Sequence, residues 1–426
     1  MPIAIVGMLD EREEALRLLK EKIEQRGHRA LLMDISVGNG AIVPSLKADV
    51  SCAELAELAE KVAADGTRKA ATAIMADGFR RKIIALNESG ELEGIIAITG
   101  MTGALISLNG MDALPFGLPK LLISGATGQP VHASQFANYF AVKDITVMNT
   151  VVDTVGMNSL VKTLAVNGAN AICGMVEGGR ISLQEGRPSI AITEFGFCDR
   201  GAHYIREILE RDYDLVSFHA TGLGDKALLD LVPQGIFGAC IDLVPGAFTE
   251  YLLGGNRGIA GPDRLNVAAN LTVPYIFCPG GFDIISCGPI ERRDRNDPLW
   301  TSRKLAERKL YLQDAHRVQA RMSLRETEYV AAAAAEKLNQ YPGKSRVKVV
   351  IPLKGFSSIS IEGGPLHDPS ADSVFRTTIR KHLDPAIEVF EVDSDINSPE
   401  FAGAVAKALS HALKERSATG GRLQNE

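Results

Sequence analysis

Short apolar runs alternate with helix-forming segments along most of the chain, and this alternation constrains the fold more than any other feature. The clearest run is Gly94–Ile98 (GIIAI), which contains only apolar residues, most of them β-branched. Such a run is typical of a strand that is buried on both faces of a parallel sheet. Because strands that alternate with helices form βαβ units, the sequence predicts an α/β protein with doubly wound, mainly parallel sheets.

The 426 residues are too many for one core of ordinary size, so we expect two domains. The first series has strands expected at 2–7, 29–34, 94–98, 120–124 and 145–149, with helices at 10–24, 53–64, 67–85 and 158–176. The second has strands expected at 190–195, 213–219, 236–242, 273–278 and 347–352, a long helix at 315–338 and a closing βα unit at 387–413. Between them, residues 177–188 are polar and contain glycine. We therefore predict two Rossmann-like domains, 1–183 and 184–426.

Charge and cysteine usage exclude several classes of protein. The formal net charge is −6, which offers no basic surface for nucleic acid. No apolar run approaches the ~20 residues that span a bilayer, and the N-terminus lacks the basic and apolar regions of a signal peptide. The six cysteines form no CxxC pair, which indicates reduced thiols and no zinc site. We expect a cytoplasmic protein with no nucleic-acid or membrane partner, and we assign no metal ligands.

The first candidate site follows the strand at 94–98. Thr99-Gly-Met-Thr-Gly103 leads directly into a helix-compatible segment, and this arrangement points free backbone N–H groups at an anion. Gly100 and Gly103 would let the backbone approach a phosphate, and Thr99 and Thr102 would add hydroxyl donors. A plain βα turn is the alternative interpretation.

Four further residues complete the cofactor-binding set of the first half. Gly7 ends the first strand, Asp34 lies about where a ribose-binding acid falls in Rossmann folds, and Ser124 and Thr127 follow the strand at 120–124. The chain has neither GxGxxG nor GxxxxGK[ST], which argues against a dinucleotide fingerprint and a Walker-type phosphate loop.

In the second half, His219, Asp242 and Asp283 stand at or just beyond the ends of successive predicted strands. The carboxyl ends of parallel strands meet at one edge of a sheet, so these groups are our candidates for proton transfer or divalent-metal chemistry. The cofactor-binding candidates beside them are Thr221, Gly222 and Gly224. The structural alternative is a buried histidine held by a backbone carbonyl, with the two acids capping helices. Ser357 and Ser358 have no nearby base in sequence, so a serine hydrolase is unsupported.

Several motifs together resemble a known family. They are the turn within 94–103, LPKLLIS at 118–124, VVD at 151–153 with GMN at 156–158, FHATGLG at 218–224, YLLGG at 251–255 and HDP at 367–369. In combination they resemble the bacterial uncharacterised family that includes the N-terminal half of the tomato mosaic virus resistance protein, which is described as ATP-binding. The first turn differs: this chain has Gly7-Met8 and Asp10-Glu-Arg12 where the plant relative has Gly-Thr and Asp-Thr-Lys.

The resemblance implies two Rossmann-like subdomains, nucleotide on the N-terminal one, and homodimers. ATP is the implied cofactor, with Mg²⁺ as an accompanying ion, and a separate phosphoenolpyruvate-mutase-like TIM barrel is a candidate partner. Our first hypothesis is therefore a nucleotide- or phosphate-binding protein that takes a small anionic ligand. The alternatives are an enzyme of small-carboxylate metabolism, a lyase or hydrolase, and a module that binds and inhibits another protein.

Overall fold

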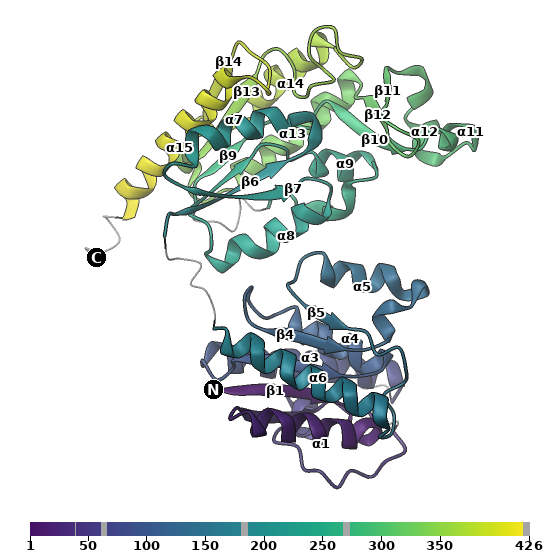
Figure 1. Cartoon of the computed structure of the whole chain (residues 1–426). Helices are drawn as coiled ribbons and strands as arrows, with labels where there is room; N and C mark the ends of the chain where they lie inside the picture. The colour runs from purple at the N-terminus through teal and green to yellow at the C-terminus, as the bar shows by residue number, and fades with distance from the viewer. Residues whose placement is uncertain (39, 61–65, 180–185, 267–272, 421–426) are drawn as a thin grey trace. The chain divides into compact units, whose positions relative to one another are not determined.

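The computed structural model of the chain (Figure 1) describes residues 1–38, 40–60, 66–179, 186–266 and 273–420, apart from the side chains of 416–420. The chain divides into two compact units, Met1–Ser182 and Leu183–Glu426. Each unit has its own parallel sheet with a hydrophobic core on either face. The predicted α/β class with mainly parallel sheets is thus confirmed.

A five-stranded parallel sheet forms the centre of the first unit, in the order β2-β1-β3-β4-β5. Ile5 of β1 lies opposite Leu32 of β2 on one side and Ile96 of β3 on the other, and all three are fully buried. The strands are β1 (Pro2–Gly7), β2 (Arg29–Asp34), β3 (Gly94–Ile98), β4 (Lys120–Ile123) and β5 (Thr146–Met148). Continuous apolar runs therefore became the central strands, as expected for a sheet covered on both faces.

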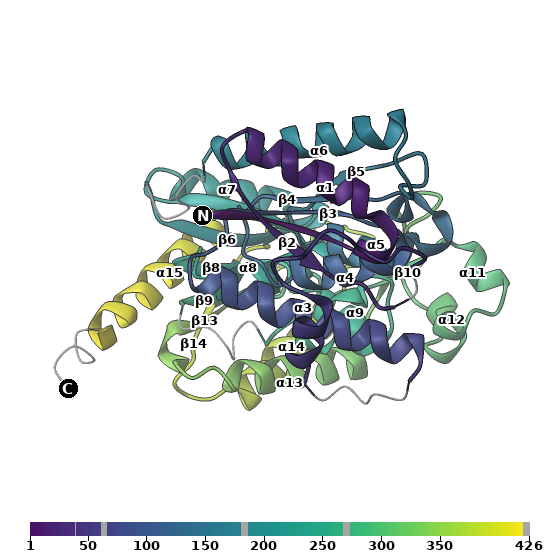
Figure 2. The same ribbon diagram turned by 90° about the horizontal axis from the view of Figure 1, so that it is seen from below.

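Helices cover both faces of this sheet. Figure 2 shows α1 (Leu9–Gln25) and α6 (Ser159–Glu177) on one face, and α3 (Arg68–Glu88) and α4 (Met101–Met111) on the other. The shorter elements of the unit are α2 (Cys52–Glu57), η1 (Ala126–Gly128), η2 (Pro130–His132) and α5 (Ala133–Phe140). The helix predicted at 53–64 ends at Glu57, and residues 61–65 lie outside the described residues.

The second unit repeats the strand order of the first and extends it by one strand. Its six parallel strands run β14-β13-β9-β8-β6-β7, so β6 lies between β7 and β8 as β1 lies between β2 and β3. The strands are β6 (Ser189–Glu194), β7 (Asp214–His219), β8 (Ala239–Asp242), β9 (Tyr275–Phe277), β13 (Val347–Pro352) and β14 (Glu388–Val392). Both units therefore have the doubly wound order in which the chain reverses direction beside its first strand.

The sheet of the second unit also lies between two layers of helices. On one face α7 (Asp199–Leu209) packs with α15 (Pro399–Gly420). On the other face lie α8 (Leu223–Leu231), α9 (Ala247–Leu253), α13 (Leu324–Asn339) and α14 (Pro369–His382). Short elements connect these: η3 (Gly196–Cys198), η4 (Val232–Gln234), η5 (Gly258–Asp263), α11 (Glu291–Asp294), α12 (Pro298–Ser302), η6 (Leu305–Glu307) and η7 (Lys344–Arg346).

The long helix predicted at 315–338 is wrong in its first third. Residues Val318–Arg321 form β12, which pairs antiparallel with β10 (Ile284–Gly288) and β11 (Leu310–Leu312) in a small separate sheet. The helix begins only at Leu324, because Ser323 accepts the N–H of Glu326 while the Glu326 carboxylate accepts the N–H of Ser323. This capping box is a start signal that the apolar pattern alone did not reveal.

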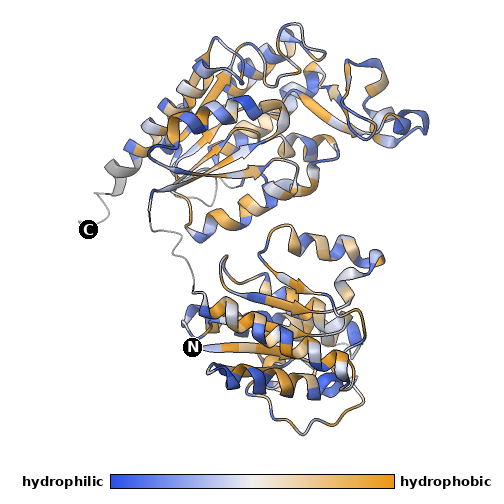
Figure 3. Ribbon diagram, in the orientation of Figure 1, coloured by the Kyte–Doolittle hydropathy of each residue, from blue (hydrophilic) through white to orange (hydrophobic). Residues whose placement is uncertain are grey.

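Hydropathy follows the layers in both units. In Figure 3 the central strands are mainly hydrophobic, whereas the helices carry hydrophilic residues on their outer sides. None of the described helices combines the length and the apolar character that crossing a bilayer requires.

Candidate functional site

A hollow of about 770 Å³ lies at the carboxyl edge of the first sheet, next to the boundary between β1 and β3. The helices that follow these two strands, α1 and α4, pack on opposite faces of the sheet, so the two connecting loops diverge. Open α/β sheets bind ligands in the crevice that such divergence leaves. The loops after β4 and β5 complete the walls, and all the lining residues belong to the first unit.

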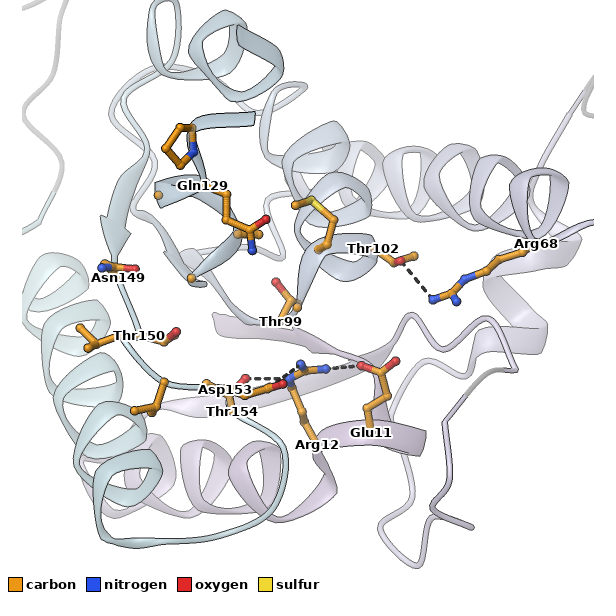
Figure 4. Close-up of a pocket in the computed structure, with 18 residues that line it drawn as sticks. Glu11, Arg12, Arg68, Thr99, Thr102, Gln129, Asn149, Thr150, Asp153 and Thr154 are labelled. Atoms are coloured by element: carbon orange, nitrogen blue, oxygen red, sulfur yellow. Dashed lines mark hydrogen bonds and ion pairs between the residues drawn. The ribbon is translucent and has the colours of Figure 1, made fainter. Parts of the chain in front are cut away.

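Arg12 supplies a guanidinium group to this hollow. Its backbone departs from helical geometry inside the first turn of α1 (φ −134°, ψ 30°). The Nε atom donates to the hydroxyl of Thr154 at 2.7 Å, Nη2 lies 3.3 Å from the Asp153 carboxylate, and Nη1 pairs with Glu11 (Figure 4). These contacts fix a buried cation where a ligand would meet it.

Thr99 and the N-terminus of α4 form the opposite wall. The Oγ1 atom of Thr99 is buried and has no hydrogen-bond partner among the described residues, although Thr99 lines the hollow. The N–H groups in the first turn of a helix have no intrahelical acceptor. In α4 the N-cap residue is Gly100, and no side chain caps these groups. An unpaired buried hydroxyl is costly, and a ligand oxygen at this position would satisfy it.

Gly100 and Gly103 lie against side chains of the site, and their approach to a phosphate stays a prediction. A Cβ atom on Gly100 would lie 2.8 Å from Nη2 of Arg12, and one on Gly103 would lie 2.9 Å from the side chain of Thr99. The absence of side chains therefore makes room for Arg12 and Thr99 themselves. Of the two glycines, Gly100 lines the hollow.

Charges in the hollow largely offset one another. Arg12 faces the carboxylates of Glu11 and Asp153, and the side chain of Asp153 is 77% exposed. Arg68, an exposed residue at the start of α3, adds a second cation and donates to Thr102 Oγ1 at 3.4 Å (Figure 4). A bare arginine pair would bind any anion, whereas this set offers both donors for a phosphate and carboxylates for a cation that accompanies it.

The other predicted residues of the first unit lie outside the hollow. Asp34 accepts hydrogen bonds from the N–H groups of Leu9 and Ser36, and these bonds tie the start of α1 to the end of β2. Gly7 is covered by Leu16, and Ser124 accepts the N–H of Ala126. Thr127 donates to the carbonyl of Ser124 at 3.4 Å. Each of these contacts shapes a loop, and none faces the hollow.

Several lining residues were missed by sequence reasoning. They come from the first turn of α1, from the start of α3 and from the loops after β4 and β5: Glu11, Arg12, Arg68, Gln129, Asn149, Thr150 and Asp153. A signal for two of them existed. The Asp10-Glu-Arg12 and Val151-Val-Asp153 segments each follow a strand of this sheet at its carboxyl edge, where side chains from separate loops converge.

In the second unit, Asp242 is enclosed in a buried network. Its carboxylate pairs with both Nη atoms of Arg264 at 2.7 Å and accepts hydrogen bonds from Thr193 (2.7 Å) and Tyr275. Arg264 also pairs with Asp225 of α8, and the three charged side chains are fully buried. These partners fill the carboxylate's acceptor positions, so we assign Asp242 a structural role.

His219 is exposed at the end of β7, beside the ring of Phe195 with a centroid distance of 6.0 Å. The structural alternative of a buried histidine is therefore wrong. Gly222 (φ 97°) donates its N–H to the carboxylate of Asp225, and a Cβ on Gly224 would lie 2.2 Å from the carbonyl of His219. The hydroxyl of Thr221 also reaches that carbonyl, at 3.5 Å. The turn before α8 is thus closed by its own contacts.

Asp283 lies in a buried polar cluster. Its Oδ2 accepts the hydroxyl of Ser357 at 2.6 Å, while its Oδ1 has no partner among the described residues. Ser360 in turn contacts Ser357 at 3.1 Å. Asp283 is therefore the carboxylate that contacts Ser357, although the two residues are far apart in sequence. Across the described part of the chain, no three His, Cys, Asp or Glu side chains are arranged to hold a metal ion.

Comparison with known proteins assigns the family. Residues 1–180 match the profile of the Uncharacterised protein family (UPF0261) N-terminal domain, and residues 187–413 match that of its C-terminal domain. The chain belongs to the UPF0261 family. A UPF0261 protein of Clostridium tetani is 30% identical over 417 residues, which cover 97% of this chain and 99% of the relative. One from Mesorhizobium japonicum is 30% identical over 412 residues, 96% and 99% of the two chains.

A plant protein is also related. The ToMV resistance protein Tm-1(GCR237) of Solanum lycopersicum is 29% identical over 378 residues, which cover 86% of this UPF0261 chain and 47% of the tomato protein. The match therefore spans about half of the plant relative. The predicted likeness to this family is confirmed, whereas ATP binding by this UPF0261 chain stays a prediction.

Proposed function

We propose that the first unit of this UPF0261 protein binds a phosphorylated small molecule, and that ATP with Mg²⁺ is the first ligand to test. The observation that carries the proposal is the convergence of Thr99, with its unpaired buried hydroxyl, Arg12 and the uncapped N-terminus of α4 on one hollow. Backbone N–H groups, hydroxyls and arginines are the donors that phosphate oxygens take in proteins.

Different residues of the first unit would bind different parts of the ligand. The first-turn N–H groups of α4 and the hydroxyls of Thr99 and Thr102 would hold one phosphate group, and Arg12 and Arg68 would bind the remaining oxygens. Glu11 and Asp153 supply carboxylate oxygens to a cation on the phosphate chain. Mg²⁺ is usually held by one or two carboxylates together with substrate phosphates, so the lack of a three-ligand cluster in the described residues fits this arrangement.

The test is calorimetric titration of the full chain with inorganic phosphate, tripolyphosphate and ATP, each with and without Mg²⁺. Thr99→Val removes the unpaired hydroxyl and keeps the shape of the side chain. We expect an unchanged or slightly higher melting temperature, because no hydrogen bond is lost, and binding weaker by about 10-fold or more, since hydrogen bonds to charged groups contribute about 1.5–3 kcal/mol.

Ser107→Ala is the matched control. Ser107, on α4, also has a buried hydroxyl with no partner among the described residues, but it does not line the hollow. Its removal should leave both the melting temperature and the affinity close to those of the parent. Equal losses of affinity in the two variants, or no binding of any phosphate compound by the parent, would contradict the proposal.

A further inference from the structure

The second unit has buried charged atoms without partners at the carboxyl edge of its sheet. The loops that follow the neighbouring strands β9 and β13 meet there, and Asp283 of the first loop accepts the hydroxyl of Ser357 of the second at 2.6 Å. Asp283 is fully buried, and its Oδ1 atom has no hydrogen-bond partner among the described residues. Burying a carboxylate oxygen without a donor is costly, and a ligand that donates a hydrogen bond would offset that cost.

Arg321 lies next to Asp283. Across the paired strands β10 and β12, the N–H of Met322 donates to the carbonyl of Asp283 at 3.2 Å. The guanidinium of Arg321 is buried and donates through Nη2 to the carboxylate of Asp372 on α14. Its Nε and Nη1 atoms have no partner within the described part of the chain. Open hydrogen-bond donors therefore lie beside an open acceptor.

The charges of this cluster do not balance. Arg321 pairs with Asp372, whereas the carboxylate of Asp283 contacts only the neutral hydroxyl of Ser357. One positive charge thus faces two negative charges, a formal total of −1. Burial raises the pKa of Asp372 to about 6 against the effect of Arg321, and the charge of Asp283 adds to the rise. A positive group at Asp283 would neutralise the cluster.

These observations define the ligand by its groups. An ammonium group donates hydrogen bonds and carries the positive charge that Asp283 lacks, while a carboxylate accepts from the open nitrogens of Arg321. An α-amino acid has both groups on one carbon atom. A hydroxy acid would leave the charge of Asp283 uncompensated, and a phosphate would add to the negative charge.

Aromatic rings limit the size of such a ligand. Phe282 and Phe356 precede Asp283 and Ser357 in sequence, and both pack edge to face on Phe375 of α14, with centroid distances of 5.5 and 5.1 Å. All three rings are buried. The side chain of the ligand must therefore be small, and the ligand enters through local opening of the enclosing loops.

We propose that this cluster binds a small α-amino acid, whose ammonium group contacts Asp283 and whose carboxylate contacts Arg321. The site belongs to the second unit and does not depend on phosphate binding by the first.

The experiment uses pairs of compounds that differ in one group. The full chain is titrated by calorimetry with glycine, L-alanine and L-serine, and with glycolate, L-lactate and L-glycerate, in which a hydroxyl replaces the ammonium group. We expect at least one amino acid to bind about tenfold more tightly than its hydroxy acid, or better, because hydrogen bonds between charged groups are the stronger ones. No binding of any amino acid, or equal affinities within every pair, would overturn the inference.

Asp283→Asn tests the contact with the ammonium group, because it removes the charge and keeps an acceptor for Ser357. It should bind the amino acid about tenfold more weakly and the hydroxy acid as the parent does. Asp384→Asn is the matched control: this carboxylate is partly exposed, pairs with Lys344 and lies beyond the other end of α14 from Asp372. It should bind both compounds like the parent, and equal losses in the two variants would contradict the proposal.

Arg321→Lys tests the contact with the carboxylate. Lysine keeps a positive charge beside Asp372 but lacks the guanidinium nitrogens, so this variant should bind both members of a pair more weakly. It also decides the question if the Asp283 variant does not fold. Unchanged affinity of the Arg321 variant for the amino acid would overturn the inference.

Discussion

Individual side chains in the first hollow differ in how fully they are bonded. Arg12 is tied to Thr154, Asp153 and Glu11, whereas the hydroxyl of Thr99 has no partner among the described residues. Thr99 therefore has the most to gain from a ligand. The ion pair of Asp153 with Arg12 is the weakest of these contacts, because the Asp153 carboxylate is largely exposed and lies 3.3 Å from Nη2 of Arg12. It competes with any incoming anion for the same guanidinium.

Removing that competitor should strengthen metal-free binding. Asp153→Asn keeps an oxygen for the N–H of Val155 but removes the negative charge beside Arg12. Without divalent cations we expect tripolyphosphate to bind roughly 1.4- to 5-fold more tightly, since exposed ion pairs contribute about 0.2–1 kcal/mol. Glu14→Gln, an exposed change on α1 outside the hollow, should have no effect in the same titration. Weaker binding by the Asp153 variant without metal would contradict this account.

Residue types at strand ends were predictable, but their partners were not. Thr99, Gly100 and Thr102 were expected at the site and do line the hollow. Arg12 was missed because an arginine in the first turn of a helix usually points to solvent, and its position depends on a backbone break that no propensity encodes. Asp242 was expected to be reactive, because nothing in sequence showed that Arg264, 22 residues away, would enclose it.

At the scale of elements, the second unit departs from its predicted secondary structure at the start of α13. The capping box at Ser323 and Glu326 begins α13 and frees residues 318–321 to form β12. Burial alone would raise the pKa of Glu326, but hydrogen bonds from Arg308, from the Ser323 backbone and from Arg303 lower it to about 2. Its carboxylate thus joins the start of the helix to the two arginines that precede β11.

Lowering the pH should weaken the contacts of the Glu326 carboxylate over a defined pH range. The folded pKa of Glu326 lies below its ordinary value of 4.5, so the ionised group stabilises the fold above pH 4.5, and this contribution is lost as the pH falls toward 2. Allowing for solvent screening, we expect about 1–2 kcal/mol. Glu326→Gln should lower the free energy of unfolding at pH 7 by that amount and flatten its dependence between pH 5 and 3. An unchanged pH profile would show that the carboxylate contributes nothing.

At the scale of the whole molecule, the two units share a strand order and differ in their contents. All residues that line the first hollow come from Met1–Ser182, which has its own two hydrophobic cores. The fold class followed from sequence because it depends on many apolar runs at once. The ligand, the oligomeric state and the partners depend on a few surface residues. The pattern of apolar runs along the chain does not specify which residues these are.

Separation of the units should preserve binding. A fragment of residues 1–179 contains every lining residue, so we expect it to fold and to bind ATP or tripolyphosphate within about threefold of the affinity of the full chain, a difference below 1 kcal/mol. Circular dichroism would report folding, and calorimetry would report affinity. A folded fragment that has lost binding would show that the second unit completes the site.

The carboxylates beside Arg12 also govern how a ligand arrives. A lone arginine attracts anions over the Debye length, whereas Arg12 together with the carboxylates of Glu11 and Asp153 has a formal net charge of −1 (+1 −1 −1) and gives no such attraction. Arg68 remains the main source of long-range attraction. Association should therefore be slow for an anion site and should change little between low and physiological salt. If the proposed function holds, we expect phosphorylated compounds to be distinguished by their dissociation rates, after the ligand has entered the hollow.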